Sequence, residues 1–191
     1  MLRAAHQSDT SLRGAYYGSL APALRMLGEM WESDELSFLD MSMASGRIFA
    51  IMRGFQRDGF RPMNTATPER LALLATIPGE EHTMGITMAA DLMREAGWVV
   101  DLRVDVTKDV LIADAGRLPY AVIALSGARA LVEANLAGLI VALRRGTPGA
   151  RVMLCGQMLN LMPGIGPRVG ADGAETDFDA AMALMESYVS G

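Results

Sequence analysis

The chain contains little of the chemistry that marks several common protein classes. Its 191 residues include one cysteine and two histidines. The single cysteine, Cys155, excludes an internal disulfide and fits a reducing, cytoplasmic location. No apolar run reaches eighteen residues, and Arg3, Arg13 and Arg25 interrupt any signal-peptide pattern. We therefore expect neither a membrane span nor a leader.

Positive charge is also scarce. Lys and Arg number 17 against 22 Asp and Glu, which leaves a formal net charge of −5. Broad nucleic-acid binding needs a basic face that displaces counterions, so we expect no direct contact with nucleic acid. Apolar residues make up 51% of the chain, enough for a substantial core. Fifteen methionines fit an ordinary core and a surface that adapts to a large ligand equally well.

The first third of the chain predicts helices. Residues 12–31 carry apolar side chains at three- and four-residue spacing, interrupted by Pro22. Residues 34–55 repeat the pattern, and Ser33 or Asp34 is the predicted cap. An N-terminal helical subdomain is the expected result.

A linker is predicted at residues 59–68, which contain two prolines and several small residues. It separates the helical subdomain, residues 1–62, from a second domain, residues 69–191. In the second domain short apolar segments alternate with helical ones. The predicted strands are 71–77, 99–104, 120–125, 151–155 and 168–171, and the predicted helices are 84–96, 107–115, 130–145, a short one after residue 156, and 178–189. This alternation predicts an α/β fold, a flavodoxin-like (Rossmann-like) five-stranded parallel sheet in the order 2-1-3-4-5.

That strand order predicts where a ligand would bind. In open α/β sheets the crevice lies beyond the carboxyl ends of the strands where the order reverses, here strands 1 and 3. The loops after these strands hold residues 80–85 and 126–129. His82 and Ser126 are therefore expected at one crevice.

His82 is the candidate metal ligand. A neutral imidazole offers a lone pair to a metal, and a carboxylate on its other nitrogen, from Glu80 or Glu81, would fix the tautomer. A solvated loop histidine is the alternative. Gly85 would let a bulky planar ligand approach the start of the helix. One histidine and one carboxylate cannot form a closed zinc site, which needs four ligands.

Ser126 invites two other interpretations. It could bond a ligand at the strand tip or cap the following helix. A triad of Ser126, His82 and Glu80 is not favoured, because the Gly-x-Ser-x-Gly elbow is absent and the local sequence reads Ala-Leu-Ser-Gly-Ala. Cys155 ends an apolar strand, which predicts a buried, inert thiol, with a role as heme ligand or redox sensor as the alternative.

The order Glu80-x-His82-x-x-Gly85 resembles the Asp-x-His-x-x-Gly signature of vitamin B12-binding domains. The whole segment 76–85, Thr-Ile-Pro-Gly-Glu-Glu-His-Thr-Met-Gly, is most similar to the photosynthesis-regulating branch of that family. This branch comprises the AppA and PpaA/AerR antirepressors, whose domain is called the sensor containing heme instead of cobalamin (SCHIC). The resemblance spans roughly residues 20–189.

The resemblance implies a tetrapyrrole ligand, cobalamin or alternatively heme. It assigns His82 the role of lower axial ligand and Glu80 that of its carboxylate partner. Ser126 corresponds to a hydroxyl near the dimethylbenzimidazole tail, Gly156 to the first glycine of a paired-glycine motif, and Trp31 to a residue stacked over the upper face. The full set of predicted ligand-binding residues is Trp31, Glu80, His82, Thr83, Met84, Gly85, Ser126, Gly127, Gly156 and Gln157.

The sequence departs from the family pattern at several positions. Glu80 replaces aspartate, and Gln157 replaces the second glycine, which would put a side chain where the tail passes. The upper-face histidine of B12 photoreceptors is missing, since Asp40, Met41 and Ser42 stand at the corresponding distance from Trp31. Light trapping of that kind is therefore not expected, and heme is a competitor of cobalamin.

These observations predict a cytoplasmic, non-enzymatic sensory domain that regulates transcription through a repressor protein, as an antirepressor does. A corrinoid carrier of a methyltransferase system is the alternative from a different class. A ligand-free interaction module is the third possibility. The sequence indicates no oligomeric state.

Overall fold

The computed structural model divides into two compact units, Met1–Arg61 and Pro62–Gly191. It describes residues 11–58 and 68–190. The predicted linker at residues 59–68 lies outside the described residues except for its last position.

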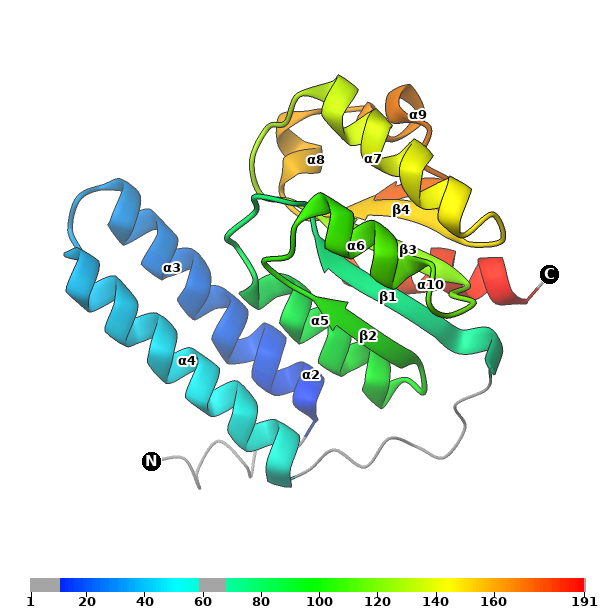
Figure 1. Cartoon of the computed structure of the whole chain (residues 1–191). Coiled ribbons are helices and arrows are strands. Elements are labelled where there is room, and N and C mark those ends of the chain that lie inside the picture. The colour runs from blue at the N-terminus through cyan, green and yellow to red at the C-terminus, as the bar shows by residue number, and fades with distance from the viewer. Residues whose placement is uncertain (1–10, 59–67, 191) are drawn as a thin grey trace. The chain divides into compact units, whose positions relative to one another are not determined.

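Helices make up the described part of the N-terminal unit, as predicted. Their bounds are α2 (Leu12–Ala15), the π-helical turn η1 (Tyr16–Leu20), α3 (Ala21–Glu32) and α4 (Phe38–Asp58). The first three follow one another without a break, and α4 returns beside α3 (Figure 1). The Tyr16 ring meets the Phe55 ring edge-on, with 6.0 Å between centroids, and so links the two arms.

Pro22 changes the hydrogen bonding of the first arm without ending the helix. Proline has no N–H to donate, and its ring crowds the carbonyl four residues earlier. The π-helical turn directly precedes α3, and Pro22 lies in the first turn of α3. The predicted interruption is therefore a local widening of the helix.

The predicted cap of the second arm was wrong. Ser33 ends α3, and Asp34 has a positive φ of 58° in the connecting turn. The cap is Ser37, whose backbone N–H donates to Asp40 Oδ2 at 3.1 Å, while the Asp40 N–H donates to Ser37 Oγ at 3.2 Å. This reciprocal pair satisfies two backbone donors at the start of α4.

The second unit is an α/β fold. Its strands are β1 (Leu71–Thr76), β2 (Val99–Arg103), β3 (Val122–Ser126), β4 (Arg151–Cys155) and β5 (Gly173–Glu175). Its helices are η2 (Pro68–Arg70), α5 (Met84–Glu95), α6 (Lys108–Ala115), α7 (Glu133–Gly146), α8 (Met158–Leu161), α9 (Ile165–Val169) and α10 (Phe178–Val189). All strand pairs are parallel, and the order is β2-β1-β3-β4-β5. The predicted flavodoxin-like sheet is confirmed.

The prediction of a strand at residues 168–171 was wrong. Arg168 and Val169 belong to α9. Gly170 caps that helix in the left-handed conformation, with a φ of 77°. The fifth strand follows at Gly173–Glu175 and is only three residues long. A segment this short, with few apolar residues, shows no alternating pattern from which a strand could be predicted.

Two hydrophobic layers cover the sheet, and β1 supplies side chains to both. Leu73 and Ala75 pack with residues of α6 and α7, whereas Ala72 and Leu74 pack with residues of α5 and α10. Figure 1 shows these helix pairs on opposite faces of the sheet. Burial of β1 on both faces explains its continuous apolar sequence.

The carboxyl ends of the central strands lie in one row. Thr76 of β1 pairs with Ser126 of β3, which in turn pairs with Cys155 of β4. The loops that leave these residues therefore start side by side, at the position where ligands bind in folds of this kind.

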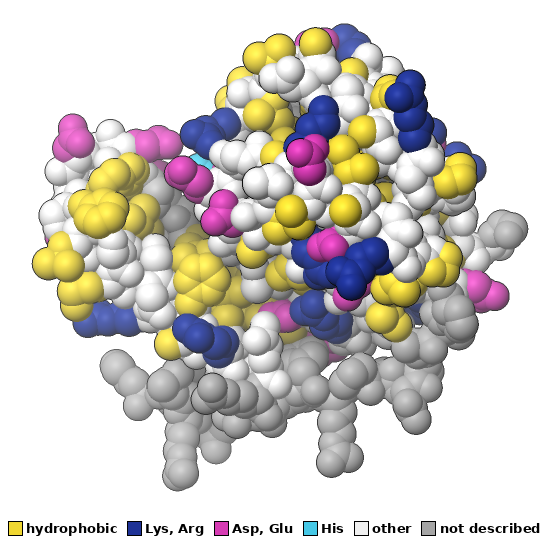
Figure 2. All heavy atoms as spheres, in the orientation of Figure 1, with side chains coloured by type: hydrophobic (Ala, Val, Ile, Leu, Met, Phe, Trp, Pro, Cys, Tyr) yellow, Lys and Arg dark blue, Asp and Glu magenta, His cyan; other side chains and the backbone are white. Residues whose placement is uncertain are grey.

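The scarcity of positive charge and the short apolar runs of the sequence are visible in the structure. On the face drawn in Figure 2, Lys and Arg side chains lie among acidic and apolar ones without forming one basic patch of described residues. Within residues 11–58 and 68–190, no helix combines the length and apolar character of a membrane span.

Candidate functional site

The loop between β1 and α5 folds back on itself and turns two neighbouring polar side chains in different directions. The N–H of Glu80 donates to the carbonyl of Ile77 at 2.9 Å, and Gly79 allows this turn with a φ of 85°. The Glu80 side chain is 3% exposed, and that of His82 is 66% exposed. The carboxylate thus points into the protein and the imidazole into solvent.

Glu80 joins the two loops of the predicted crevice. Its Oε1 accepts the backbone N–H of His82 at 2.9 Å and lies 2.5 Å from His82 Nδ1. Its Oε2 accepts the backbone N–H of Ala128, in the loop after β3, at 2.7 Å. A single buried side chain therefore orients the imidazole and holds the loop after β3 beside it.

Glu80 is ionised despite its burial. Burial alone raises the pKa of a carboxyl group, but the N–H groups of Ala128 and His82 and the His82 ring outweigh it and lower the pKa of Glu80 to about 2. An ionised carboxylate can only accept hydrogen bonds, so His82 Nδ1 must carry the proton. The lone pair of a neutral His82 ring is then on Nε2.

Nε2 is the atom of the His82 ring that could bind a metal. Within the described part of the chain no residue hydrogen-bonds to it. In residues 11–58 and 68–190, no three His, Cys, Asp or Glu side chains gather so that they could hold a metal ion. His82 could therefore offer a metal one nitrogen ligand through Nε2.

The predicted residues that follow His82 open helix α5. Thr83 is its N-cap residue and Met84 its first residue, and both are half-buried. Gly85 is exposed, and a Cβ added to it would meet no atom within 4 Å. The position beside Gly85 is therefore open, and the approach of a bulky ligand there stays a prediction.

The structure places Ser126, Gly127 and Gly156 together at the tips of β3 and β4. Ser126 is not a helix cap, since α7 begins at Glu133 with a different cap residue. Gly156 has a φ of 91°, and a Cβ on it would lie 2.5 Å from the Gly127 carbonyl oxygen and 3.0 Å from Ser126 Oγ. Only glycine fits this contact between the two strand tips.

Cys155, one residue earlier, is a half-buried free thiol whose surroundings favour the protonated form. Burial raises its pKa to about 11, although a hydrogen bond with Ser126 works in the opposite direction. Its Sγ–H donates to the carbonyl of Leu125 at 3.5 Å. The raised pKa agrees with the prediction of an unreactive thiol, but the residue is half-buried and not fully buried as predicted.

Two of the predicted site residues do not join the cluster. Gln157 is exposed, whereas the next residue, Met158, is fully buried beside Gly127. That Gln157 stands where the tail would pass therefore stays a prediction, and the side chain that packs against Gly127 is that of Met158. Trp31 belongs to the N-terminal unit, at the end of α3, and its place over a ligand stays a prediction.

Sequence reasoning missed two groups that hold the His82 loop. One is the Ala128 amide described above. The other is Arg129, whose Nη2 donates to the Gly79 carbonyl at 2.7 Å. A backbone amide carries no residue-type signal. Arg129 belongs to the segment 126–129, which the sequence predicts at the crevice. No motif around Arg129 indicates that its side chain would bond to the His82 loop.

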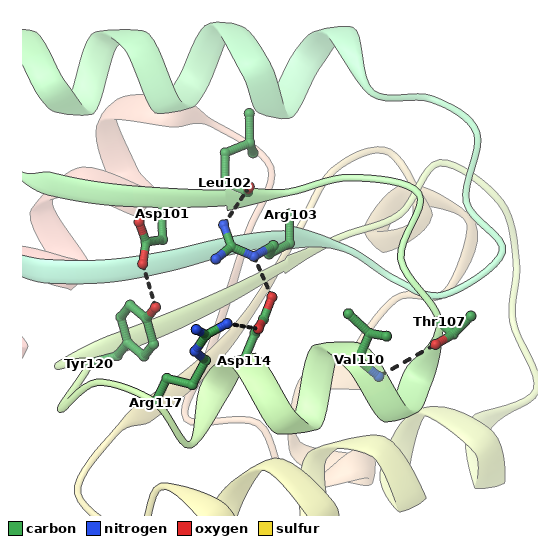
Figure 3. A network of polar contacts seen from close by, with 8 residues as sticks. All are labelled: Asp101, Leu102, Arg103, Thr107, Val110, Asp114, Arg117 and Tyr120. Atoms are coloured by element: carbon green, nitrogen blue, oxygen red, sulfur yellow. Dashed lines mark hydrogen bonds and ion pairs between the residues drawn. The ribbon is translucent and has the colours of Figure 1, made fainter.

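A second polar cluster lies at the β2 edge of the sheet (Figure 3). Arg103 Nε donates to Asp114 at 2.5 Å, Arg117 donates to the same carboxylate at 3.2 Å, and Tyr120 OH donates to Asp101 at 2.5 Å. These polar groups pair with one another and link β2 to α6 and to Tyr120, just ahead of β3. The cluster is structural, and the His82 loop is the stronger candidate site.

Comparisons with known proteins identify the family of this chain. Residues 70–182 match the model of the B12 binding domain. An uncharacterized 20.5 kDa protein in the bchF-crtJ intergenic region of Rhodobacter capsulatus is 30% identical over 99 residues, which are 50% of this chain and 48% of the relative. The matched part thus spans about half the length of that protein.

Two solved structures share the fold. The monomethylamine corrinoid protein of Methanosarcina barkeri is similar over 97% of this chain and 88% of its own, with a TM-score of 0.75 and 16% identity. A cobalamin-binding protein from Desulfitobacterium hafniense DCB-2 is similar over 85% of this chain and 76% of its own, with a TM-score of 0.55 and 19% identity. The family predicted from the Glu80–Gly85 motif is confirmed, because the matched residues 70–182 cover more than half of the chain. This chain belongs to the B12-binding domain family.

Proposed function

We propose that this protein binds cobalamin through His82 and acts as a sensory domain, without catalysis, that regulates transcription by contact with a repressor protein. The observation that carries the ligand assignment is the pair formed by Glu80 and His82. A buried, ionised carboxylate fixes the Nδ1 proton and leaves Nε2 as a lone-pair donor in solvent.

The groups around His82 fit a corrinoid. Cobalamin supplies a cobalt ion that needs only an axial ligand from the protein. His82 would provide that ligand, and Glu80 would keep the ring oriented and its free nitrogen basic. Gly85 leaves room beside the ligand, since no atom lies within 4 Å of a Cβ added there.

The regulatory part of the proposal has separate support. The segment 76–85 is similar to the antirepressor branch of the family, and the Rhodobacter capsulatus relative is encoded in the bchF-crtJ intergenic region. The net charge of −5 disfavours direct DNA binding, so an effect on transcription would pass through a protein. A ligand changes such a contact only if it binds two arrangements of the protein with different affinity.

A corrinoid carrier is the second candidate. It is supported by the TM-score of 0.75 with the monomethylamine corrinoid protein of Methanosarcina barkeri. In that role the domain would present a methylated corrinoid to separate methyltransferases. A likeness at 16% identity indicates the fold, which several functions share.

Ligand binding is tested by visible spectroscopy of the purified protein titrated separately with hydroxocobalamin and hemin. We expect stoichiometric hydroxocobalamin uptake with a band shift that is lost in His82→Ala and kept in His6→Ala, which removes the other histidine. A His82-dependent Soret band with hemin, and no cobalamin uptake, would establish the heme alternative. Uptake of neither ligand would refute the proposal and favour an interaction module.

Regulation and carrier activity are separated with the loaded protein. We expect binding to a transcription repressor, measured by surface plasmon resonance, to differ at least several-fold between the hydroxocobalamin-loaded and the ligand-free protein. His82→Ala should abolish that difference. Transfer of a methyl group from the methylcobalamin-loaded protein to a methyltransferase, with no ligand-dependent repressor binding, would identify the carrier instead.

A further inference from the structure

Negative charge gathers at the edge of the sheet from which the His82 loop leaves. Besides the ionised Glu80, the strand ends and the segments that follow them carry Glu81 after β1, Asp105 and Asp109 after β2, and Glu175 at the end of β5. The first three of these additional carboxylates are exposed, and the last is half-buried. Among the described residues, no basic side chain forms an ion pair with any of these four.

Asp105 is fixed beside the His82 loop by a buried hydroxyl group. Its backbone is left-handed, with a φ of 53°, a conformation that Asp and Asn adopt more readily than most residues. Its N–H donates to Thr76 Oγ1 at 3.1 Å. Thr76 is the last residue of β1 and is 1% exposed, so the turn after β2 is tied to the strand end that leads to His82.

The basic side chains of the same segments do not cancel this charge. Lys108 Nζ lies 4.0 Å from the position of a Cβ on Gly138, in the middle of α7 and away from the strand ends. Arg129 does contribute a positive charge, since its partner is the uncharged Gly79 carbonyl. The carboxylates outnumber it, so the potential at this edge is negative.

Acidic groups in other parts of the same unit are paired with arginine. Asp172 pairs with Arg144 and Arg151, and Glu186 pairs with Arg70. The exposed carboxylates near His82 therefore contribute more to the potential there than these paired groups contribute to their own surroundings.

A negative edge distinguishes tetrapyrroles by the charge of their side chains. The corrin ring of cobalamin carries uncharged amides, whose N–H groups can donate to carboxylates, whereas the propionates of heme are repelled by them. We propose that Glu81 and Asp105 make the His82 site selective for a corrinoid with uncharged amide side chains and against tetrapyrroles that carry carboxylates, heme included. This inference rests on the proposed binding of cobalamin through His82.

The test compares ligands that differ only in charge. The b, d and e monocarboxylic acids of hydroxocobalamin carry a propionate in place of a propionamide on the lower face of the ring, and their methylamides restore a neutral group. Each is titrated into the protein and followed by the visible band shift. At low salt we expect the acids to bind about fivefold or more weakly than the methylamides. In 1 M NaCl the difference should fall below about twofold, because exposed charges are screened.

A double variant, Glu81→Gln with Asp105→Asn, removes two charges and leaves His82 and Glu80 in place. Asn also adopts the left-handed conformation, so the turn after β2 is retained. We expect the ratio of the two dissociation constants to fall by at least about half, while the affinity for hydroxocobalamin changes less than about twofold. The matched control is Glu69→Gln with Glu95→Gln, exposed residues before β1 and at the end of α5. It changes the net charge equally at the opposite edge and should leave the ratio unchanged.

Several results would overturn the inference while cobalamin binding stands. These are equal binding of acids and methylamides by the wild-type protein, a difference that persists in high salt, and a ratio that the double variant leaves unchanged or that the control lowers as much. Failure of hydroxocobalamin itself to bind would overturn the proposed function and the inference together.

Discussion

The carboxylate of Glu80 lies 2.5 Å from His82 Nδ1, and only one of these two side chains is exposed. The buried partner is fixed by a third group, the Ala128 amide at 2.7 Å. The direction of the exposed imidazole is therefore determined from inside the protein. A substitution of Glu80, which is buried beneath His82, should therefore change the affinity of His82 for its ligand.

Glu80→Gln tests this dependence. The amide has nearly the size of the carboxylate but no charge, so the orientation and basicity of His82 are weakened. We expect the dissociation constant for hydroxocobalamin to rise about 10- to 100-fold, the range typical of groups that support metal-binding histidines. Glu81→Gln changes the exposed carboxylate next to Glu80 in the sequence. It should change the dissociation constant for hydroxocobalamin by less than about twofold. Equal effects of the two substitutions would show that Glu80 has no special role.

The same carboxylate predicts acid sensitivity. The pKa of Glu80 is lowered from 4.5 to about 2 in the folded protein, so its contribution to stability is fully present above pH 4.5 and is lost as the pH falls toward 2. A shift of this size corresponds to about 3 kcal/mol. Urea unfolding from pH 7 to pH 2.5 should show a shallower loss of stability in Glu80→Gln than in the wild type. Parallel curves for the two proteins would contradict the prediction.

Gly156→Ala should destabilise the strand tips. The residue has a φ of 91°, and a Cβ would lie 2.5 Å from the Gly127 carbonyl oxygen, so strain and overlap add. We expect the free energy of unfolding in urea to fall by about 2 kcal/mol or more. Gly149→Ala is the matched control, because no atom lies within 4 Å of its Cβ position. It should change the stability by less than about 1 kcal/mol.

Arg129→Ala should affect binding more than stability. Arg129 is exposed, and its bond to the Gly79 carbonyl fastens the turn that precedes His82. We expect hydroxocobalamin to bind about two- to fivefold more weakly, a loss below 1 kcal/mol that suits an exposed hydrogen bond. The midpoint of urea unfolding should stay within the error of the measurement. Arg117→Ala, which removes an exposed arginine on the β2 edge, is the control and should leave the affinity unchanged.

Much of the fold was predictable because local patterns matched the final packing. Strands buried on both faces produce continuous apolar runs, and β1, β3 and β4 were found that way. The pairing of Glu80 with His82 was predictable because the two residues are close in sequence. The fifth strand was missed, since its three residues carry no periodic signal.

The contacts among the strand tips and the loops that follow them are harder to predict. Met158 packs beside Ile77 and Gly127, which are distant in sequence, and apolar character alone does not say which layer of the core a side chain joins. The Ala128 amide is a backbone group and has no signature in the sequence. Both depend on the register of β1, β3 and β4, which becomes definite only when the whole sheet forms.

The bond between Glu80 and the Ala128 amide has a kinetic consequence. It connects two loops that leave neighbouring strands, so the His82 loop is ordered by the sheet before any ligand arrives. An ordered loop loses little conformational entropy when it binds, and association need not wait for folding of the site. The rate at which the protein captures its ligand should then be set by diffusion and ligand exchange at the metal, with the protein acting as a rigid partner.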